Sequence, residues 1–332
     1  MGRVNVAVVG ATGAVGREMV KILGERKFPI KDLFLLASEK SAGETIRMNR
    51  REYKVEELDN NSFDDIDIAL FSAGSAVSKK YAPIAAKNGT IVIDNSSAFR
   101  MDAKVPLIVP EVNYQDIKKH DGIIANPNCS TIQMVVALKP ILDEVGIDRI
   151  IVSSYQSVSG TGKDAIDELS SQSSQVLNNK KITRKVYPHQ IAFNILPHID
   201  VFENNGYTKE EMKLIHETNK IFGNTKIKIT ATAARVPVFH GHSESVYIET
   251  KNQISINKLK KIYLKTKGIK LVDDINNSKY PLAIMSEIYD EVMIGRLRKD
   301  LSDPNGINMW IVANNLRKGA ALNAVQIAEF LI

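Results

Sequence analysis

The sequence predicts an α/β protein of two domains, and three observations lead to this prediction. In the first third of the 332 residues, short apolar runs alternate with helix-length segments, which is typical of βαβ units and a mainly parallel sheet. A glycine-rich turn at residues 10–16 joins the first apolar run to the first helical segment. Beyond residue 129 the strand patterns become longer, which predicts an α+β domain on a larger, mixed sheet.

The expected elements of the first domain follow from apolar runs and from the turn signals between them. Strands are expected at residues 4–9, 33–37, 66–71, 90–93 and 122–125. Helices are expected from the glycine-rich turn to residue 23 and at residues 75–87. Because strands separated by helix-length connections run in the same direction, a mainly parallel sheet is predicted.

The second domain is expected to contain longer strands at residues 149–158, 226–234 and 243–251. Helices are expected at residues 132–142, 163–177 and 209–222, and the Ser/Gln-rich residues 170–174 are predicted to form an exposed helix end. The Ala-rich residues 316–332 predict an amphipathic helix that packs back onto the first domain.

The composition limits the class of protein. Hydrophobic residues make up 44% of the chain and charged residues 25%, as in ordinary globular proteins. The net charge is +6, but the basic residues are scattered rather than interleaved with aromatic ones, which favours small anionic ligands over nucleic acid. No apolar run approaches the roughly 20 residues of a membrane span, and the start has no signal-peptide pattern. One cysteine excludes an intrachain disulfide, so a cytoplasmic location is predicted, without membrane partner or metal site.

The glycine-rich turn carries the cofactor prediction. Glycines at every third position after the first strand allow the backbone to approach a pyrophosphate, which a helix N-terminus attracts. This pattern predicts a Rossmann-like dinucleotide-binding domain, and a turn needed only for packing is the alternative. The residues expected to contact the cofactor here are Gly10, Thr12, Gly13, Ala14, Val15 and Gly16.

Residues after the second strand bear on the choice between NAD and NADP. An acidic residue there holds a ribose 2′-hydroxyl, whereas a cation and a hydroxyl accommodate a 2′-phosphate. The chain has both Glu39 and Lys40, so spacing alone does not decide. Ser38 and Lys40 together favour NADP, and Ser41 belongs to the same expected site.

The only cysteine, Cys129, lies in Asn-Pro-Asn-Cys-Ser-Thr at residues 126–131, where a turn is predicted to open into a helix. Backbone N–H groups and the helix dipole at such a position favour the thiolate, the reactive form of cysteine. The same donors can hold the oxyanion formed when a thiolate attacks a carbonyl. The alternative is a buried, inert cysteine, but this context favours a nucleophile.

Seven segments taken together resemble the aspartate-semialdehyde dehydrogenase family. They are GATGAVG at 10–16, SSAFR at 96–100, NPNCST at 126–131, SYQSVSG at 154–160, HETNK at 216–220, RVPVFHGHS at 235–243 and NNLRKGA at 314–320. They follow the family's order and span nearly the whole chain. One departure is Lys40, where the family pattern Ala-Ser-x-Arg-Ser-Ala-Gly has arginine.

The resemblance implies NADPH-dependent reduction of L-aspartyl 4-phosphate to L-aspartate 4-semialdehyde with release of phosphate, in the pathway to lysine, threonine and methionine. It also implies a homodimer, with a Rossmann domain of residues 1–128 and 316–332 and a catalytic and dimerisation domain of residues 129–315. Cys129 is implied as the nucleophile that forms a thioester, His242 as the acid–base residue, and Gln156 as the residue that orients the thiol or the intermediate.

The implied substrate carries a carboxylate, an ammonium and a phosphate, and each needs a complementary group. Arg235 can hold the α-carboxylate as a bidentate fork, and Glu217 can pair with the ammonium. Lys220, on the same helix face as Glu217, and Arg100 are expected to hold the phosphate. A solvated Glu–Lys pair is the alternative for the two helix residues. The remaining expected site residues are Asn128 for the substrate and Ser75, Ser159, Gly160 and Asn315 for the cofactor.

Three other protein classes share part of this pattern. N-acetyl-glutamyl-phosphate reductase has the same architecture, but its cysteine motif is closer to Asn-Pro-Gly-Cys-Tyr. The Ser-Cys-Thr-Thr-Asn pattern of glyceraldehyde-phosphate dehydrogenase is absent from the sequence. A non-catalytic Rossmann protein that senses NADP has no reason to keep a nucleophile, a base and anion-binding groups together.

Overall fold

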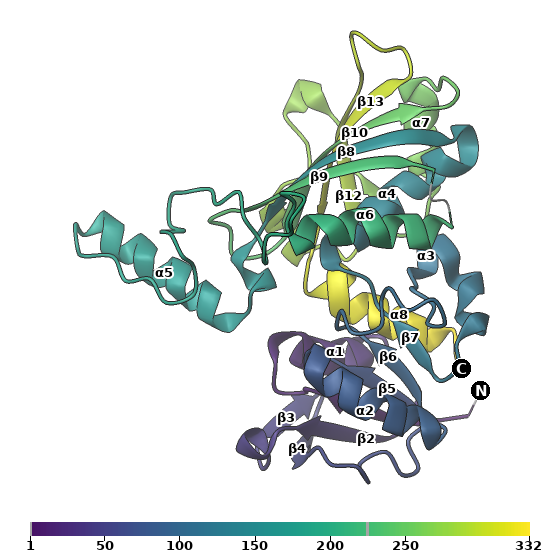
Figure 1. Ribbon diagram of the computed structural model, residues 1–332, viewed down its shortest axis with the longest axis vertical. Helices are drawn as coiled ribbons and strands as arrows, with labels where there is room; N and C mark the ends of the chain where they lie inside the picture. Colours follow the sequence, from purple (N-terminus) through teal and green to yellow (C-terminus); the bar gives the residue numbers. More distant parts are fainter. Residues whose placement is uncertain (1, 224–225) are drawn as a thin grey trace. The chain divides into compact units, whose positions relative to one another are not determined.

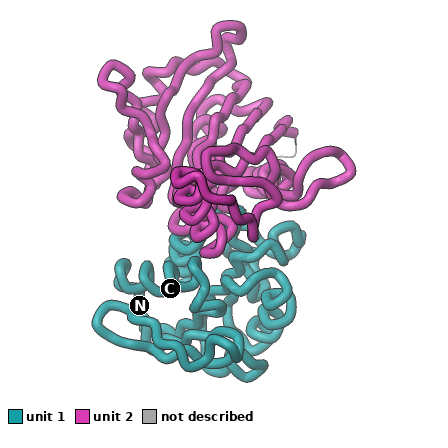
Figure 2. Tube along the Cα trace, turned by 90° about the vertical axis from the view of Figure 1, so that its left-hand side faces the viewer, with its two compact units in different colours: residues 1–128, 319–332 teal, residues 129–318 magenta. Residues whose placement is uncertain are grey.

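A computed structural model describes residues 2–223 and 226–332 of the chain. The chain forms two compact units, which Figure 2 distinguishes by colour. Unit 1 consists of residues 1–128 and 319–332, and unit 2 of residues 129–318. The predicted C-terminal segment 316–332 is therefore divided between the units after Lys318.

Unit 1 is built on a seven-stranded sheet in the order β3-β4-β2-β1-β5-β6-β7. Its strands are β1 (Val4–Val9), β2 (Ile30–Ala37), β3 (Thr45–Met48), β4 (Arg51–Glu57), β5 (Ile68–Phe71), β6 (Ile91–Asp94) and β7 (Ile123–Ala125). All neighbouring strands pair in parallel except β3 and β4, so the predicted mainly parallel sheet is confirmed. The β3–β4 hairpin was not predicted, because its residues are largely polar and exposed at the sheet edge.

The helices of unit 1 are α1 (Ala14–Glu25), α2 (Ser75–Lys87), α3 (Pro110–Asn113) and α8 (Leu322–Glu329). The central strand β1 is buried from Val6 to Val9, as expected when helices cover both faces of a parallel sheet. Helix α8 packs against α1 and the sheet (Figure 1) and is buried on nearly all sides. The predicted amphipathic pattern is therefore wrong for this helix, which also follows a π-helical turn at Arg317–Ala321.

Unit 2 is built on a six-stranded sheet in the order β11-β12-β13-β10-β8-β9. Its strands are β8 (Ile147–Gln156), β9 (Lys228–Arg235), β10 (His242–Thr250), β11 (Ile269–Leu271), β12 (Val292–Lys299) and β13 (Gly306–Ala313). The pairs β8–β9 and β11–β12 are parallel and the others antiparallel, so the predicted mixed sheet is confirmed.

The helices of unit 2 are α4 (Cys129–Val145), α5 (Lys163–Leu177), α6 (Lys209–Phe222) and α7 (Ile256–Tyr263). Helices α4 and α6 pack against the sheet, whereas α5 extends away from it (Figure 1). The predicted bounds of α5 and α6 are confirmed.

The Ser/Gln-rich end of α5 is not wholly exposed, contrary to the prediction. Gln172 is buried, and its Oε1 accepts hydrogen bonds from the backbone N–H groups of Ile191 and Ala192 at 2.9 and 3.2 Å. These bonds tie the following loop back to the helix. Within the described residues, no helix is long and apolar enough to cross a membrane.

Candidate active site

Cys129 is the first residue of α4 and is half-buried. Strand β7 ends at Ala125, and Pro127 disfavours a helical backbone at the residue before it, so the helix starts only after this turn. It starts three residues earlier than the predicted residue 132 and continues to Val145. The thiol thus lies where backbone N–H groups and the helix dipole stabilise a thiolate.

The topology of the unit 2 sheet brings three of the predicted site residues to one end of neighbouring strands. Gln156 ends β8 and is paired in register with Arg235, which ends the parallel strand β9. Strand β10 runs antiparallel to β8, so its first residue, His242, lies beside the end of β8. All three side chains are buried.

His242 is a neutral imidazole whose tautomer is fixed by its surroundings. The backbone N–H of Ser157 donates to Nδ1 at 3.1 Å, so Nδ1 carries no proton and the neutral ring carries it on Nε2. Burial, and secondarily the positive charge of Arg235, lowers the pKa of His242 well below its ordinary value of 6.5. The Nε2 atom is buried and has no hydrogen-bond partner among the described residues.

The side chains of Arg235 and His242 lie against the backbone of Gly160. A Cβ at this position would lie 3.0 Å from Nη1 of Arg235 and 3.2 Å from Nε2 of His242, so a side chain would displace both groups. Nη1 of Arg235 donates to the carbonyl oxygen of Ser157 at 2.8 Å, whereas its buried Nε has no partner among the described residues. Buried donors without a protein partner need an acceptor, and the oxygen atoms of a ligand or a water molecule would satisfy them.

Helix α6 contributes Glu217 and Lys220, as the sequence predicts. Glu217 is 1% exposed and Lys220 is half-buried, so the solvated-pair alternative is wrong for Glu217. Its burial agrees with a specific role for the carboxylate, and pairing with an ammonium stays a prediction.

Asn315 joins the segment after β8 to the start of β10. Its Oδ1 accepts hydrogen bonds from the Gly241 backbone N–H at 3.0 Å and from the hydroxyls of Ser157 and Ser159 at 3.2 Å. Its Nδ2 donates to the Ser159 hydroxyl at 3.0 Å. Asn315 and Ser159 were predicted to bind the cofactor, and their hydrogen bonds within unit 2 hold the loops around His242.

The glycine-rich turn of unit 1 has the geometry of a phosphate-binding turn. Gly10 has φ +80°, and a Cβ there would lie 2.6 Å from the carbonyl oxygen of Ser72. A Cβ on Gly16 would lie 2.1 Å from the carbonyl oxygen of Gly10. Gly13 is the N-cap of α1 and provides no side-chain cap, so the helix N-terminus can receive an anion. Thr12, Ala14 and Val15 lie on the same turn.

The residues predicted to read the cofactor's ribose follow β2. Ser38 and Lys40 are exposed and Ser41 is half-buried, around a short 3-10 turn at Glu39–Ser41. Lys40 forms no ion pair with any described residue. Ser75 begins α2, and its hydroxyl lies 3.0 Å from that of Ser97.

Arg100 and Asn128 are both buried in unit 1. Arg100 donates from Nε to the Asn126 carbonyl oxygen and from Nη2 to the Asn95 carbonyl oxygen, both at 2.9 Å. The guanidinium is therefore held by backbone carbonyls of two segments, the one after β6 and the turn after β7.

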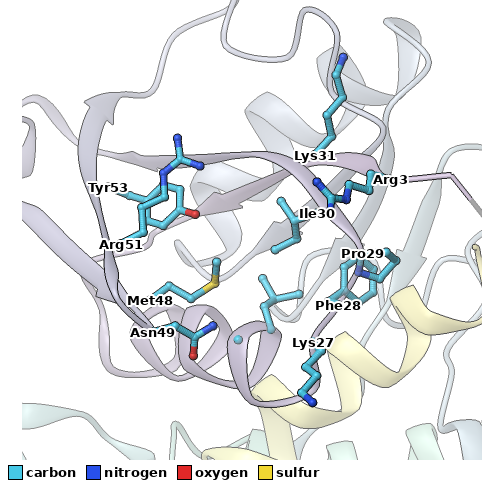
Figure 3. A pocket seen from close by; sticks show the side chains of 12 residues that line it. Arg3, Lys27, Phe28, Pro29, Ile30, Lys31, Met48, Asn49, Arg51 and Tyr53 are labelled. Atoms are coloured by element: carbon cyan, nitrogen blue, oxygen red, sulfur yellow. The ribbon is translucent and has the colours of Figure 1, made fainter.

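A hollow of about 540 Å³ on unit 1 is lined by none of the predicted site residues (Figure 3). It lies between the end of α1, the start of β2 and the β3–β4 hairpin, and four cationic residues are among those that line it. Lys27 and Lys31 point in opposite directions rather than toward a common centre (Figure 3). The hollow is thus not assigned a ligand.

Two residues of the site were missed by the sequence reasoning. Ser157 fixes the His242 tautomer, and its place in SYQSVSG directly after Gln156 could have suggested it. Glu210 accepts a hydrogen bond from Gln156, which is 54 residues away, and no local pattern signals that contact.

The fold and the site together define an oxidoreductase of the semialdehyde dehydrogenase class. The model of the semialdehyde dehydrogenase NAD binding domain matches residues 5–120, and that of the semialdehyde dehydrogenase dimerisation domain matches residues 138–318. No metal cluster of three or more His, Cys, Asp or Glu residues occurs in the part of the chain that the structure describes.

Comparison with individual relatives identifies one family within this class of oxidoreductases. The aspartate-semialdehyde dehydrogenase of Aquifex aeolicus is 55% identical over 331 residues, covering 98% of this chain and 97% of that protein. The enzyme of Bacillus subtilis is 49% identical over 340 residues, covering 100% and 98%. The crystal structure of aspartate semialdehyde dehydrogenase II from Vibrio cholerae complexed with ASA superposes with a TM-score of 0.96 at 50% identity, covering 100% of this chain and 98% of that one.

The chain belongs to the aspartate-semialdehyde dehydrogenase family and is an oxidoreductase of amino-acid biosynthesis with a nicotinamide dinucleotide-binding domain. The family assignment argues against the N-acetyl-glutamyl-phosphate reductase and the non-catalytic sensor alternatives.

Proposed function

We propose that the enzyme uses NADPH to reduce L-aspartyl 4-phosphate to L-aspartate 4-semialdehyde, with a thioester on Cys129 as intermediate. One observation carries the proposal: α4 of unit 2 begins with the only thiol, and the sheet of the same unit gathers Gln156, Arg235 and His242 at one end of its strands. This combination supplies a nucleophile, a hydrogen-bond donor and a carboxylate-binding cation.

The Cys129 thiolate attacks the acyl carbon, the carbon–oxygen bond to phosphate breaks, and inorganic phosphate leaves with its electron pair. The thioester that remains is far more electrophilic than a carboxylate. The bound nicotinamide supplies the hydride that reduces it. Collapse of the tetrahedral adduct then expels the thiolate and releases the aldehyde. Helix α4 favours the thiolate both as nucleophile and as leaving group.

His242 acts through its Nε2–H. Because Nδ1 is occupied by the Ser157 N–H, the neutral ring offers a proton rather than a lone pair. We therefore assign it to stabilise the oxyanion of the tetrahedral adducts by a hydrogen bond from Nε2–H. The helix N-terminus favours the thiolate, and the thiol proton passes to solvent water before the attack rather than to this imidazole. Gln156 orients the thiol or the intermediate.

The substrate groups are assigned to charged residues of opposite sign. Arg235 binds the α-carboxylate and Glu217 the α-ammonium, while Lys220 and Arg100 bind the phosphate, with Asn128 beside the nucleophile. The Vibrio cholerae structure is described as complexed with ASA, which supports a small aldehyde of this kind as the ligand.

The cofactor is assigned as NADP. The glycine-rich turn and the N-terminus of α1 would hold its pyrophosphate, and Ser38, Lys40 and Ser41 its 2′-phosphate. Ser75, Ser159, Gly160 and Asn315 complete the proposed cofactor site. The name of the matching dimerisation domain supports a homodimer. A catalytic thiol that must stay reduced supports a cytoplasmic location.

The test is NADP reduction by aspartate semialdehyde with and without phosphate. The proposal predicts phosphate-dependent turnover that is much weaker with NAD. Turnover that does not depend on phosphate would overturn the assigned reaction. Equal efficiency with both cofactors would overturn the assignment of NADP.

A further inference from the structure

A chain of four polar side chains leads from the surface of unit 2 to the buried end of β8. Nε2 of Gln156 donates to Oε1 of Glu210 at 3.0 Å. Nζ of Lys213 donates to Oε2 of Glu210 at 3.1 Å and to Oδ2 of Asp200 at 2.9 Å. Both carboxylate oxygens of Glu210 are thus engaged.

The surroundings of Glu210 favour its ionised form. The residue is 5% exposed and lies in the first turn of α6, where backbone N–H groups and the helix dipole stabilise negative charge. Burial of Lys213 tends to lower its pKa, but the Glu210 and Asp200 carboxylates outweigh this and raise it. The ammonium therefore stays charged and compensates the buried carboxylate.

An ionised carboxylate only accepts hydrogen bonds, and this determines which way the Gln156 amide faces. The NH₂ group must point toward Glu210, so Oε1 is presented on the opposite side. Without the carboxylate, the two orientations of the amide would differ little in energy, and the acceptor and donor could exchange places. The Asp200–Lys213–Glu210 chain removes that freedom.

We propose that Glu210 is a positioning residue for catalysis, which fixes the orientation of the Gln156 amide toward the reacting thiol or intermediate. This inference rests on the proposed role of Gln156. In this proposal Glu210 acts on the reaction through its hydrogen bond to Gln156.

The next residue provides a matched control. Glu211 is also a buried carboxylate of the first turn of α6, but it accepts the Thr208 N–H at 2.7 Å in a capping box and the Ala233 N–H at 2.9 Å. It therefore stabilises the helix and its contact with β9 without touching Gln156. The two substitutions Glu210→Gln and Glu211→Gln change the same charge at adjacent positions.

The experiment measures kcat, KM and Tm of the full-length enzyme for Glu210→Gln, Glu211→Gln, Gln156→Leu and the double variant Glu210→Gln/Gln156→Leu. We expect Glu210→Gln to lower kcat by roughly ten- to a hundredfold, as for loss of a charge-assisted hydrogen bond, with little change in KM. Glu211→Gln should lower Tm by a few degrees and keep kcat within about twofold. In the Gln156→Leu background, adding Glu210→Gln should change kcat by less than about twofold.

Three outcomes would overturn the inference. If Gln156→Leu lowers kcat but Glu210→Gln does not, Glu210 does not position the amide, and the proposed function stands. If the two effects multiply in the double variant, Glu210 acts by another route. If Gln156→Leu itself leaves kcat unchanged, the proposed role of Gln156 fails together with the inference.

Discussion

Glu244 is a buried carboxyl whose protonation state leads to a quantitative prediction for the pH dependence of stability. It is fully buried on β10, two residues after His242 and on the same face, opposite Ser154 of β8 and Ile311 of β13. Burial raises its pKa well above the ordinary 4.5, and the Gln133 amide of α4 offsets only part of this effect. Neither of its oxygens makes a hydrogen bond of normal geometry to a described residue. We therefore expect the folded protein to hold Glu244 in its neutral form.

The sign and size of the effect of pH on stability follow from the linkage between proton binding and folding. Below pH 4.5 both the folded and the unfolded chains bind the proton, and Glu244 incurs no penalty. As the pH rises above 4.5, the unfolded chain releases the proton and the folded chain keeps it, so stability is lost until the folded pKa is reached. The loss is about 1.4 kcal/mol per pH unit in that window. Glu244→Gln keeps size and polarity but cannot ionise, so it escapes this loss.

The assay is urea unfolding of wild type and Glu244→Gln at pH 5.5, 6.5 and 7.5, followed by tryptophan fluorescence. Trp310, the only tryptophan, lies on β13 next to the residue opposite Glu244, so the signal reports on unit 2. As long as the pH stays below the folded pKa of Glu244, the difference in unfolding free energy between the two proteins should grow by roughly 1.4 kcal/mol per pH unit in favour of the variant. His242 titrates in both proteins, so its contribution largely cancels. A difference that does not change with pH would show that folded Glu244 is ionised and would refute the reasoning.

Three further predictions concern the cofactor, the substrate and the core. Lys40→Ala should weaken NADP binding by roughly ten- to a hundredfold and leave NAD nearly unchanged, as measured by fluorescence titration; equal losses would exclude contact with the 2′-phosphate. Arg235→Lys should lower kcat/KM, because an ammonium cannot form a bidentate fork, whereas wild-type rates would remove Arg235 from carboxylate binding. Tyr263→Phe should cost about 1 kcal/mol in urea unfolding, since its buried hydroxyl donates to the Ala137 carbonyl oxygen at 2.8 Å, and no loss would show that this bond contributes nothing.

The sequence predicted elements whose pattern is local. The helices α5 and α6 have the periodicity and the end signals that define a helix by themselves, and their observed bounds agree with the predicted ones. The β3–β4 hairpin escaped prediction because an exposed edge pair needs little apolar patterning. The segment GINMWIVA, which forms β13, is apolar and rich in β-formers, and it could have been identified.

The candidate site likewise contains residues that a local pattern predicts and residues that only long-range contacts bring together. Cys129 could be identified from its own neighbours, because a turn signal before an apolar helix predicts a helix N-terminus. The meeting of Gln156, Arg235 and His242 depends on the register of three strands that are far apart in the chain. Only the resemblance pointed to these residues, since no local pattern encodes a sheet register. The burial of Glu217 was equally hidden, because the sequence of an exposed Glu–Lys pair looks the same.

The thioester on Cys129 is the central claim, and it is tested most directly by half of the reverse reaction. Wild-type enzyme mixed with aspartate semialdehyde and NADP in the absence of phosphate should reduce about one equivalent of cofactor per chain and then stop. Mass spectrometry of the quenched protein should find the aspartyl acyl group on Cys129 as a thioester that hydroxylamine removes, and phosphate should release it as turnover resumes. A burst that persists in Cys129→Ala, or an acyl group on another residue, would contradict the account.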